Sequence, residues 1–148
     1  MQIFDYLDLN RVQNIKGRSI MPDYTIVHLA DVKDILGDYP GEMKMMKNDL
    51  QTEQVAITYR RMPANTGAKG SHGHRHKEQE EVTFVISGNI LVKLDEKVLE
   101  LKPHDAIRIA PQVVRGFWNE GPGDVELLII SNRLKHNDSN IVENFWED

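Results

Sequence analysis

From residue 54 to residue 131, apolar and polar residues alternate over short stretches, which is the pattern of half-buried β-strands. In the first stretch, Val55, Ile57 and Tyr59 share one face. On this basis, strands are predicted over 54–61, 81–87, 89–94, 98–102, 105–110, 113–119 and 125–131. Turn residues separate most of them at intervals of roughly 8–12 residues, which is typical of a sandwich or a barrel. The pattern therefore predicts an all-β domain.

Before residue 54 the pattern is less regular. Residues 24–29 have the composition of another strand. Residues 30–36 predict a short helix that ends before Gly37. A chain of 148 residues fits one hydrophobic core. We therefore expect residues 1–20 to form an arm or extension, and residues 21–148 to form a single domain.

The C-terminal segment, residues 132–148, is polar but ends near two aromatic residues, Phe145 and Trp146. An aromatic side chain carries a large apolar surface that is costly to leave in water. Chain ends fray unless something ties them down. The two rings therefore indicate that this tail docks on the domain.

Composition and charge narrow the choice of partners and compartment. The chain has no cysteine, which excludes disulfides, thiolate metal sites and cysteine nucleophiles. Its formal net charge is −5, from 23 acidic and 18 basic residues, which argues against a nucleic-acid partner. The start, MQIFDYLDLN, has no apolar signal-peptide region. No apolar stretch approaches the roughly 20 residues of a membrane helix. We expect a cytoplasmic protein with no membrane partner.

The stretch GSHGHRHKEQEEVTFVISG, residues 70–88, carries the candidate chemistry. In a strand, His74 and His76 point to the same side, whereas His72 borders a glycine loop and is expected to lie outside the site. Glu81 reaches the same point if a tight turn precedes it. Two imidazoles and one carboxylate suit a divalent metal such as Fe, Mn, Zn or Ni. The alternative is a polar loop with solvated histidines.

The same stretch resembles the first motif of the cupins: His-x-His, three or four residues, Glu, six residues, Gly. His74, His76, Glu81 and Gly88 match it, with the four-residue gap. The resemblance implies a double-stranded β-helix, the jelly-roll barrel of the cupins. The short helix predicted over 30–36 would then be a minor helix near the N-terminus. The resemblance also implies that His74, His76 and Glu81 bind a metal, and that the protein forms a homodimer.

The second cupin motif falls on residues 104–119, where most of its residues are not kept. The two motifs and the loop before them form a motif core that spans 67–119. Only Asn119 matches, and Arg115 occupies the position of the fourth ligand, a histidine. An arginine offers only donors and cannot bind a metal. Arg115 could instead bind the acidic end of a substrate held beside the metal. Alternatively, it pairs with Glu81 and replaces the metal.

Strand alternation predicts further residues around Arg115. Phe117 lies two residues later and shares its face, and Tyr59 lines the same cavity if its own face turns inward. These three residues are the predicted contacts to a small-molecule ligand. No residue is predicted to be catalytic, apart from a weaker hypothesis of a metal-free sugar-nucleotide isomerase or epimerase with His76 as the base.

Two function classes therefore stay open at this point. The first is a metal-dependent cupin that binds or acts on a small acidic molecule. The second is a metal-free small-molecule binding module, in which Arg115 pairs with Glu81 or with an anionic ligand. The sequence does not decide whether the protein is an enzyme, because cupins share a fold while they differ in chemistry.

Overall fold

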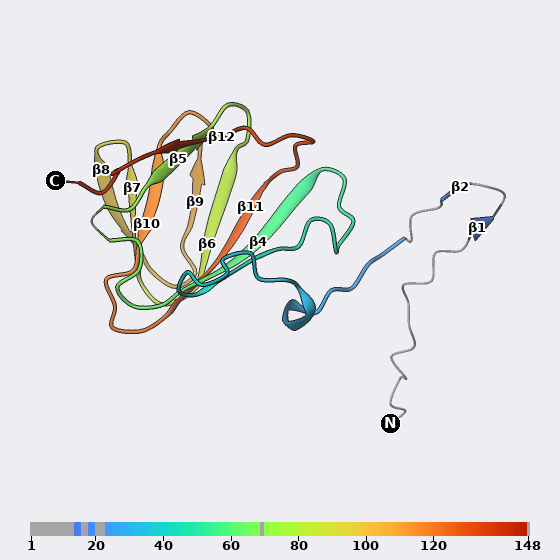
Figure 1. Ribbon diagram of the computed structural model, residues 1–148, viewed down its shortest axis with the longest axis horizontal. Coiled ribbons are helices and arrows are strands. Elements are labelled where there is room, and N and C mark those ends of the chain that lie inside the picture. The colour runs from blue at the N-terminus through green and yellow to red at the C-terminus, as the bar shows by residue number, and fades with distance from the viewer. Residues whose placement is uncertain (1–13, 16–17, 20–22, 69, 148) are drawn as a thin grey trace, which may run out of the picture.

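Two five-stranded antiparallel sheets face each other in the computed structural model, which describes residues 14–15, 18–19, 23–68 and 70–147 (Figure 1). The first sheet has the order β3-β4-β11-β6-β9. Its strands are β3 (Glu42–Met45), β4 (Val55–Met62), β11 (Val125–Asn132), β6 (Glu81–Ser87) and β9 (Ala106–Ile109). The second sheet has the order β12-β5-β10-β7-β8. Its strands are β12 (Ser139–Val142), β5 (Gly73–His76), β10 (Arg115–Trp118), β7 (Ile90–Leu94) and β8 (Lys97–Leu101).

The core lies between the two sheets and draws on the inward faces of both. Its buried apolar members are Met62, Val85, Ile90, Val92, Leu101, Val125 and Leu127. Val85 and Leu127 come from the first sheet and Val92 from the second, and all three are fully buried. Burying such a side chain stabilises the fold by about 1.5–3 kcal/mol. The alternation of apolar residues along the strands thus holds the two sheets face to face.

All seven predicted strands are present, which confirms the all-β prediction. The strand predicted over 24–29 is wrong, because residues 24–28 form no strand, and Tyr24 and Ile26 are exposed. The helix predicted over 30–36 is also wrong: the minor helix near the N-terminus is only a 3-10 turn, η1 (Leu29–Asp31).

Asp34 provides the physical reason why a helix does not continue. Its carboxylate accepts hydrogen bonds from the backbone amides of Leu36 (3.1 Å) and Met43 (2.9 Å). Asp34 also forms an isolated bridge with Lys44 of β3. A short acidic side chain that binds nearby amides offers the backbone an alternative to helix.

The arm predicted over residues 1–20 lies largely outside the described residues. Within it, the structure describes β1 (Asn14–Ile15), which pairs antiparallel with β2 (Arg18–Ser19). Within the described residues, none of the helices has the length and apolar character that crossing a bilayer requires.

The C-terminal tail docks, as predicted, on the outer face of the second sheet. Trp146 is buried, and the rings of Phe145 and Trp146 lie against Gly73 and Gly116. A Cβ atom at Gly73 would meet the Phe145 ring at 2.6 Å, and one at Gly116 would meet Trp146 Nε1 at 2.8 Å. Lys93 adds a hydrogen bond to the Phe145 carbonyl (2.8 Å). The absence of a side chain at both glycines makes room for the tail.

Gly73→Ala is therefore expected to lower the free energy of unfolding by about 1–3 kcal/mol, because the new methyl group overpacks the Phe145 ring. Gly123→Ala is the matched control, since an added Cβ there meets nothing within 4 Å. Urea unfolding of both variants, followed by tryptophan fluorescence, checks the prediction. Equal stability of the two variants would mean that the tail does not pack on Gly73.

Candidate metal centre

Three potential metal ligands meet where β5 and β6 come together. His74 and His76 lie on β5 of the second sheet, and Glu81 opens β6 of the first sheet. His76 Nε2 lies 3.3 Å from Glu81 Oε1, and His74 Nε2 lies 3.8 Å from Glu81 Oε2. One donor atom from each of the three residues can be chosen so that all lie within 4.8 Å of one another. The structure thus brings together the three residues that the sequence predicted as ligands.

The two histidines share one side of β5, as the alternation of a strand requires. Their ring centroids lie 5.1 Å apart in an edge-to-face arrangement. His72 is exposed and precedes the first residue of β5, Gly73. It lies outside the group, in the place expected for it.

Asp138 organises the turn between β5 and β6, and no sequence pattern pointed to it. Its Oδ2 accepts hydrogen bonds from the backbone amides of Lys77 (3.2 Å), Glu78 (2.9 Å) and Gln79 (3.0 Å). Its Oδ1 lies 2.8 Å from Nδ1 of His76. Asp138 lies 62 positions after His76, inside a polar stretch that is typical of a loop. Only the folded chain brings it to the site.

The carboxyl of Asp138 has a strongly lowered pKa. Burial would raise this pKa, but the amide of Glu78, the ring of His76 and the amide of Gln79 outweigh burial and hold it at about 2. Asp138 is therefore ionised throughout the physiological range.

Arg115 is fully buried at the other side of the group. Its Nε lies 3.1 Å from Oε2 of Glu81. Nη1 donates to the carbonyls of His74 (3.5 Å) and Pro111 (3.3 Å), and Nη2 donates to the carbonyl of Ala110 (3.4 Å). The guanidinium therefore cross-links the segment before β10 to β5 and lies against the carboxylate of Glu81.

The charge of Arg115 acts on Glu81. Burial would raise the pKa of Glu81, but the nearby ring of His74 and the charge of Arg115 hold it below its ordinary value. Burial lowers the pKa of Arg115, while the charge of Glu81 opposes that change. An arginine stays protonated even so. The pair is therefore a buried ion pair.

The donor set fits a divalent metal ion. Two imidazoles and one carboxylate are a combination that binds Fe, Mn, Zn or Ni. His76 Nε2 is buried and has no hydrogen-bond partner among the described residues, although a buried polar atom normally has one. An ion held by His74, His76 and Glu81 would satisfy this nitrogen.

Phe117 and Tyr59 are the two other residues predicted to contact a small-molecule ligand, and they lie apart from each other. Phe117 shares a face of β10 with Arg115 and packs against the hydrophobic core. Tyr59 pairs with Leu128, which pairs with Phe84, so that these residues share one face of the first sheet. Strand alternation places Glu81 on the opposite face from Phe84. Tyr59 is buried on that outer face, where burial and Glu126 raise its pKa to about 12.

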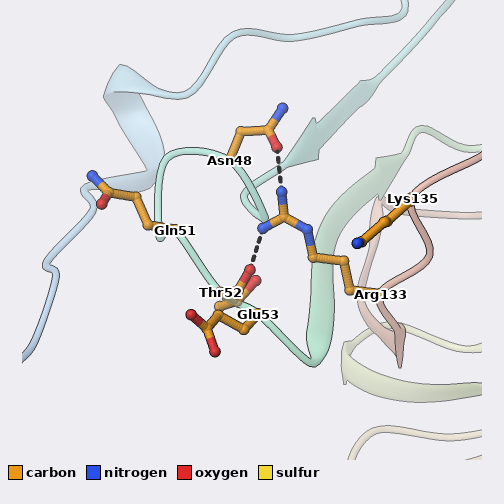
Figure 2. A pocket seen from close by; sticks show the side chains of 6 residues that line it. All are labelled: Asn48, Gln51, Thr52, Glu53, Arg133 and Lys135. Atoms are coloured by element: carbon orange, nitrogen blue, oxygen red, sulfur yellow. Dashed lines mark hydrogen bonds between the residues drawn. The ribbon is translucent and has the colours of Figure 1, made fainter. Parts of the chain in front are cut away.

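A surface hollow lies between the segment before β4 and the segment after β11, beside one end of the first sheet (Figure 2). Its lining residues are Asn48, Gln51, Thr52, Glu53, Arg133 and Lys135. Arg133 donates to the carbonyls of Lys47 (2.9 Å) and Thr52, and to Oδ1 of Asn48 (3.1 Å). These bonds tie the segment before β4 to the end of β11, so that the arginine serves the fold here.

Residues 61–131 match the family model described as a cupin domain, and they include the three candidate ligands and Arg115. The protein contains a cupin domain. This confirms the resemblance seen in the first motif, and the two facing antiparallel sheets confirm the jelly roll. Asp138 lies beyond the matched segment. Among curated proteins, none matches the sequence.

Solved structures show the same fold. A cupin protein from Bacteroides fragilis matches with a TM-score of 0.62 at 22% identity, over 80% of this chain and 91% of that chain. A sugar phosphate isomerase of the cupin superfamily from Silicibacter pomeroyi matches with a TM-score of 0.61 at 21% identity, over 74% and 76%. The polyketide cyclase RemF from Streptomyces resistomycificus matches with a TM-score of 0.60 at 21% identity, over 73% and 78%.

The lowered pKa of Asp138 predicts how stability depends on pH. Because the folded pKa is about 2 and the ordinary value is 3.8, the contribution is complete above about pH 4 and is lost as the pH falls towards 2. Asp138→Asn lacks this contribution. The gap in unfolding free energy between the unmodified protein and Asp138→Asn should therefore shrink by about 1–2 kcal/mol as the pH falls through that window.

Urea unfolding at a series of pH values measures this difference. Glu143→Gln is the control, because Glu143 is an exposed carboxylate in the same segment. A gap between Asp138→Asn and the unmodified protein that stays constant from pH 5 to pH 2 would contradict the assignment.

Proposed function

We propose that this cupin holds one divalent metal ion through His74, His76 and Glu81, and that it binds or acts on a small acidic molecule there. The observation that carries the proposal is the compact donor set, with the buried Nε2 of His76 left without a hydrogen-bond partner among the described residues. Fe, Mn, Zn and Ni all suit two imidazoles and a carboxylate.

The burial of the three ligands suggests a direction of approach. The side chain of His74 is 32% exposed, whereas those of His76 and Glu81 are 7% and 13% exposed. A small molecule would therefore reach the ion on the side of His74. Three protein ligands leave coordination positions open, as in catalytic metal sites. When bound, the ion would act as a Lewis acid on an oxygen of that molecule.

The charges around the site support an acidic ligand. Glu81 is already neutralised by Arg115, and a dication would bring positive charge that Asp138 offsets only in part. A site of net positive charge and little solvent favours an anion. One of the solved structures with the same fold is a sugar phosphate isomerase. That Arg115 touches the ligand stays a prediction, because its Nη groups already donate to carbonyls.

A second candidate is a metal-free binding module, and the ion pair between Arg115 and Glu81 favours it. The 3.1 Å separation shows that the arginine reaches the carboxylate that a metal would use. Two unit cations about 4 Å apart repel by about 4 kcal/mol at an effective dielectric of 20, and a dication doubles that value. The negative charge of Glu81 offsets this repulsion in the metal-bound form.

Elemental analysis of untagged protein, purified without chelator, tests the first candidate. We expect close to one divalent ion per chain. The double variant His74→Ala/His76→Ala should lose it, because only the carboxylate remains. His72→Ala is the matched control, since this exposed histidine lies outside the group and should leave the metal content unchanged. If His72→Ala lowered the metal content as much as the double variant does, the ligand assignment would be contradicted.

Removal of the metal separates the two candidates. The ion should stabilise the fold, by about 2.7 kcal/mol when its concentration is 100 times the Kd. Chelator-treated protein should thus melt at a lower temperature, and inorganic phosphate, as a minimal anion, should bind only after the metal is restored. Calorimetry measures the affinity for phosphate. Equal affinity with and without metal would support the metal-free module instead.

A further inference from the structure

A buried carboxylate outside the three ligands contacts one of them directly. Asp138 Oδ1 lies 2.8 Å from Nδ1 of His76, and Asp138 itself is 5% exposed. We propose that Asp138 is a positioning residue for the metal centre, which fixes the tautomer of His76 and directs its Nε2 at the ion. This inference rests on the proposed function, because it assigns a task toward the same ion.

The chemistry of the contact determines the tautomer. An ionised carboxylate only accepts hydrogen bonds, so in a neutral His76 ring the proton must sit on Nδ1. Nε2 is then left with its lone pair, which is the form that binds a metal. The same Nε2 is buried, lies 3.3 Å from Glu81 Oε1 and has no hydrogen-bond partner among the described residues.

Asp138 cannot turn away from the ring without loss. Its Oδ2 accepts from three successive backbone amides, those of Lys77, Glu78 and Gln79, at 2.9–3.2 Å. These amides belong to the turn that joins the strand of the histidines to the strand of Glu81. One carboxylate therefore sets both the orientation of the His76 ring and the turn that carries the chain to the third ligand.

The segment around Asp138 also holds the histidine strand in place. β12 begins at the next residue and pairs with β5 in four registered positions, from Ser139↔His76 to Val142↔Gly73. On its other side β5 pairs with β10 only at Arg115↔His74. The strand that carries two ligands thus takes most of its sheet pairing from the C-terminal segment.

Asparagine at position 138 should reverse the tautomer. Three amide donors face Oδ2, so the amide oxygen of an asparagine would take that position and its NH2 group would face His76. An NH2 group donates, so Nδ1 would become the acceptor and the proton would move to Nε2. Nε2 would then have to lose this proton before it could bind an ion.

The first measurement is made on the metal-free protein itself. Long-range ¹H–¹⁵N NMR, at a pH where the His76 ring is neutral by its own ¹⁵N shifts, should show the proton on Nδ1. The spectrum of Asp138→Asn should show it on Nε2. A proton on Nε2 in the unmodified protein overturns the inference, even if the variant does not fold.

The second measurement is the affinity for Zn²⁺ by competition with a chelator. Asp138→Asn should bind Zn²⁺ about 10–100-fold more weakly, the usual effect of losing a carboxylate behind a metal-bound histidine. Glu143→Gln, which removes an exposed carboxylate from the same segment, should bind like the unmodified protein. A folded Asp138→Asn protein with unchanged Zn²⁺ affinity overturns the inference. Failure of the unmodified protein to bind any of Fe²⁺, Mn²⁺, Zn²⁺ and Ni²⁺ would refute the proposed function, and the inference that rests on it, even where NMR shows the proton on Nδ1.

Discussion

The buried ion pair between Arg115 and Glu81 is the constraint on which the rest of the site depends. It joins β10 in one sheet to β6 in the other, and Arg115 is fully buried there. A charge in such a position is tolerated only when a counter-charge and hydrogen bonds replace water. Glu81 provides the first, and the carbonyls of Ala110 and Pro111 provide the second. The carboxylate is thereby held ionised beside the two histidines.

Glu81 can face two kinds of cation, the guanidinium of Arg115 and the metal ion proposed beside the histidines. The cation of Arg115 weakens the attraction that Glu81 can offer a dication, but it also keeps the carboxylate deprotonated and oriented. Asp138 adds a second negative charge on the far side of His76. Each buried charge thus has partners, Arg115 and Glu81 in each other and Asp138 in three backbone amides, which reduces the cost of burying it.

Much of the architecture was predictable from sequence because it follows from local patterns. Period-two alternation located seven strands, and the spacing of His74, His76 and Glu81 located the group of side chains that could hold a metal ion. What could not be predicted depends on tertiary contacts. The segment over 24–36 has the composition of regular structure, yet the carboxylate of Asp34 binds amides across a turn instead. Asp138 and β12 lie in a polar stretch whose partners are distant in sequence.

Because β5 pairs mainly with β12, the strand of the two histidines can reach its final place only after β12 has been synthesised. A ribosome releases His74, His76 and Glu81 well before Asp138 and the strand that follows it. Domains generally fold as units during synthesis, so a domain that lacks one of its strands stays incomplete. In the nascent chain, the histidine strand would lack its four-residue pairing with β12 and would keep one registered pair with β10. A chain synthesised only as far as residue 137 would therefore carry His74, His76 and Glu81 without Asp138 and β12 to hold them, and any metal would bind in the final geometry only after those residues emerge.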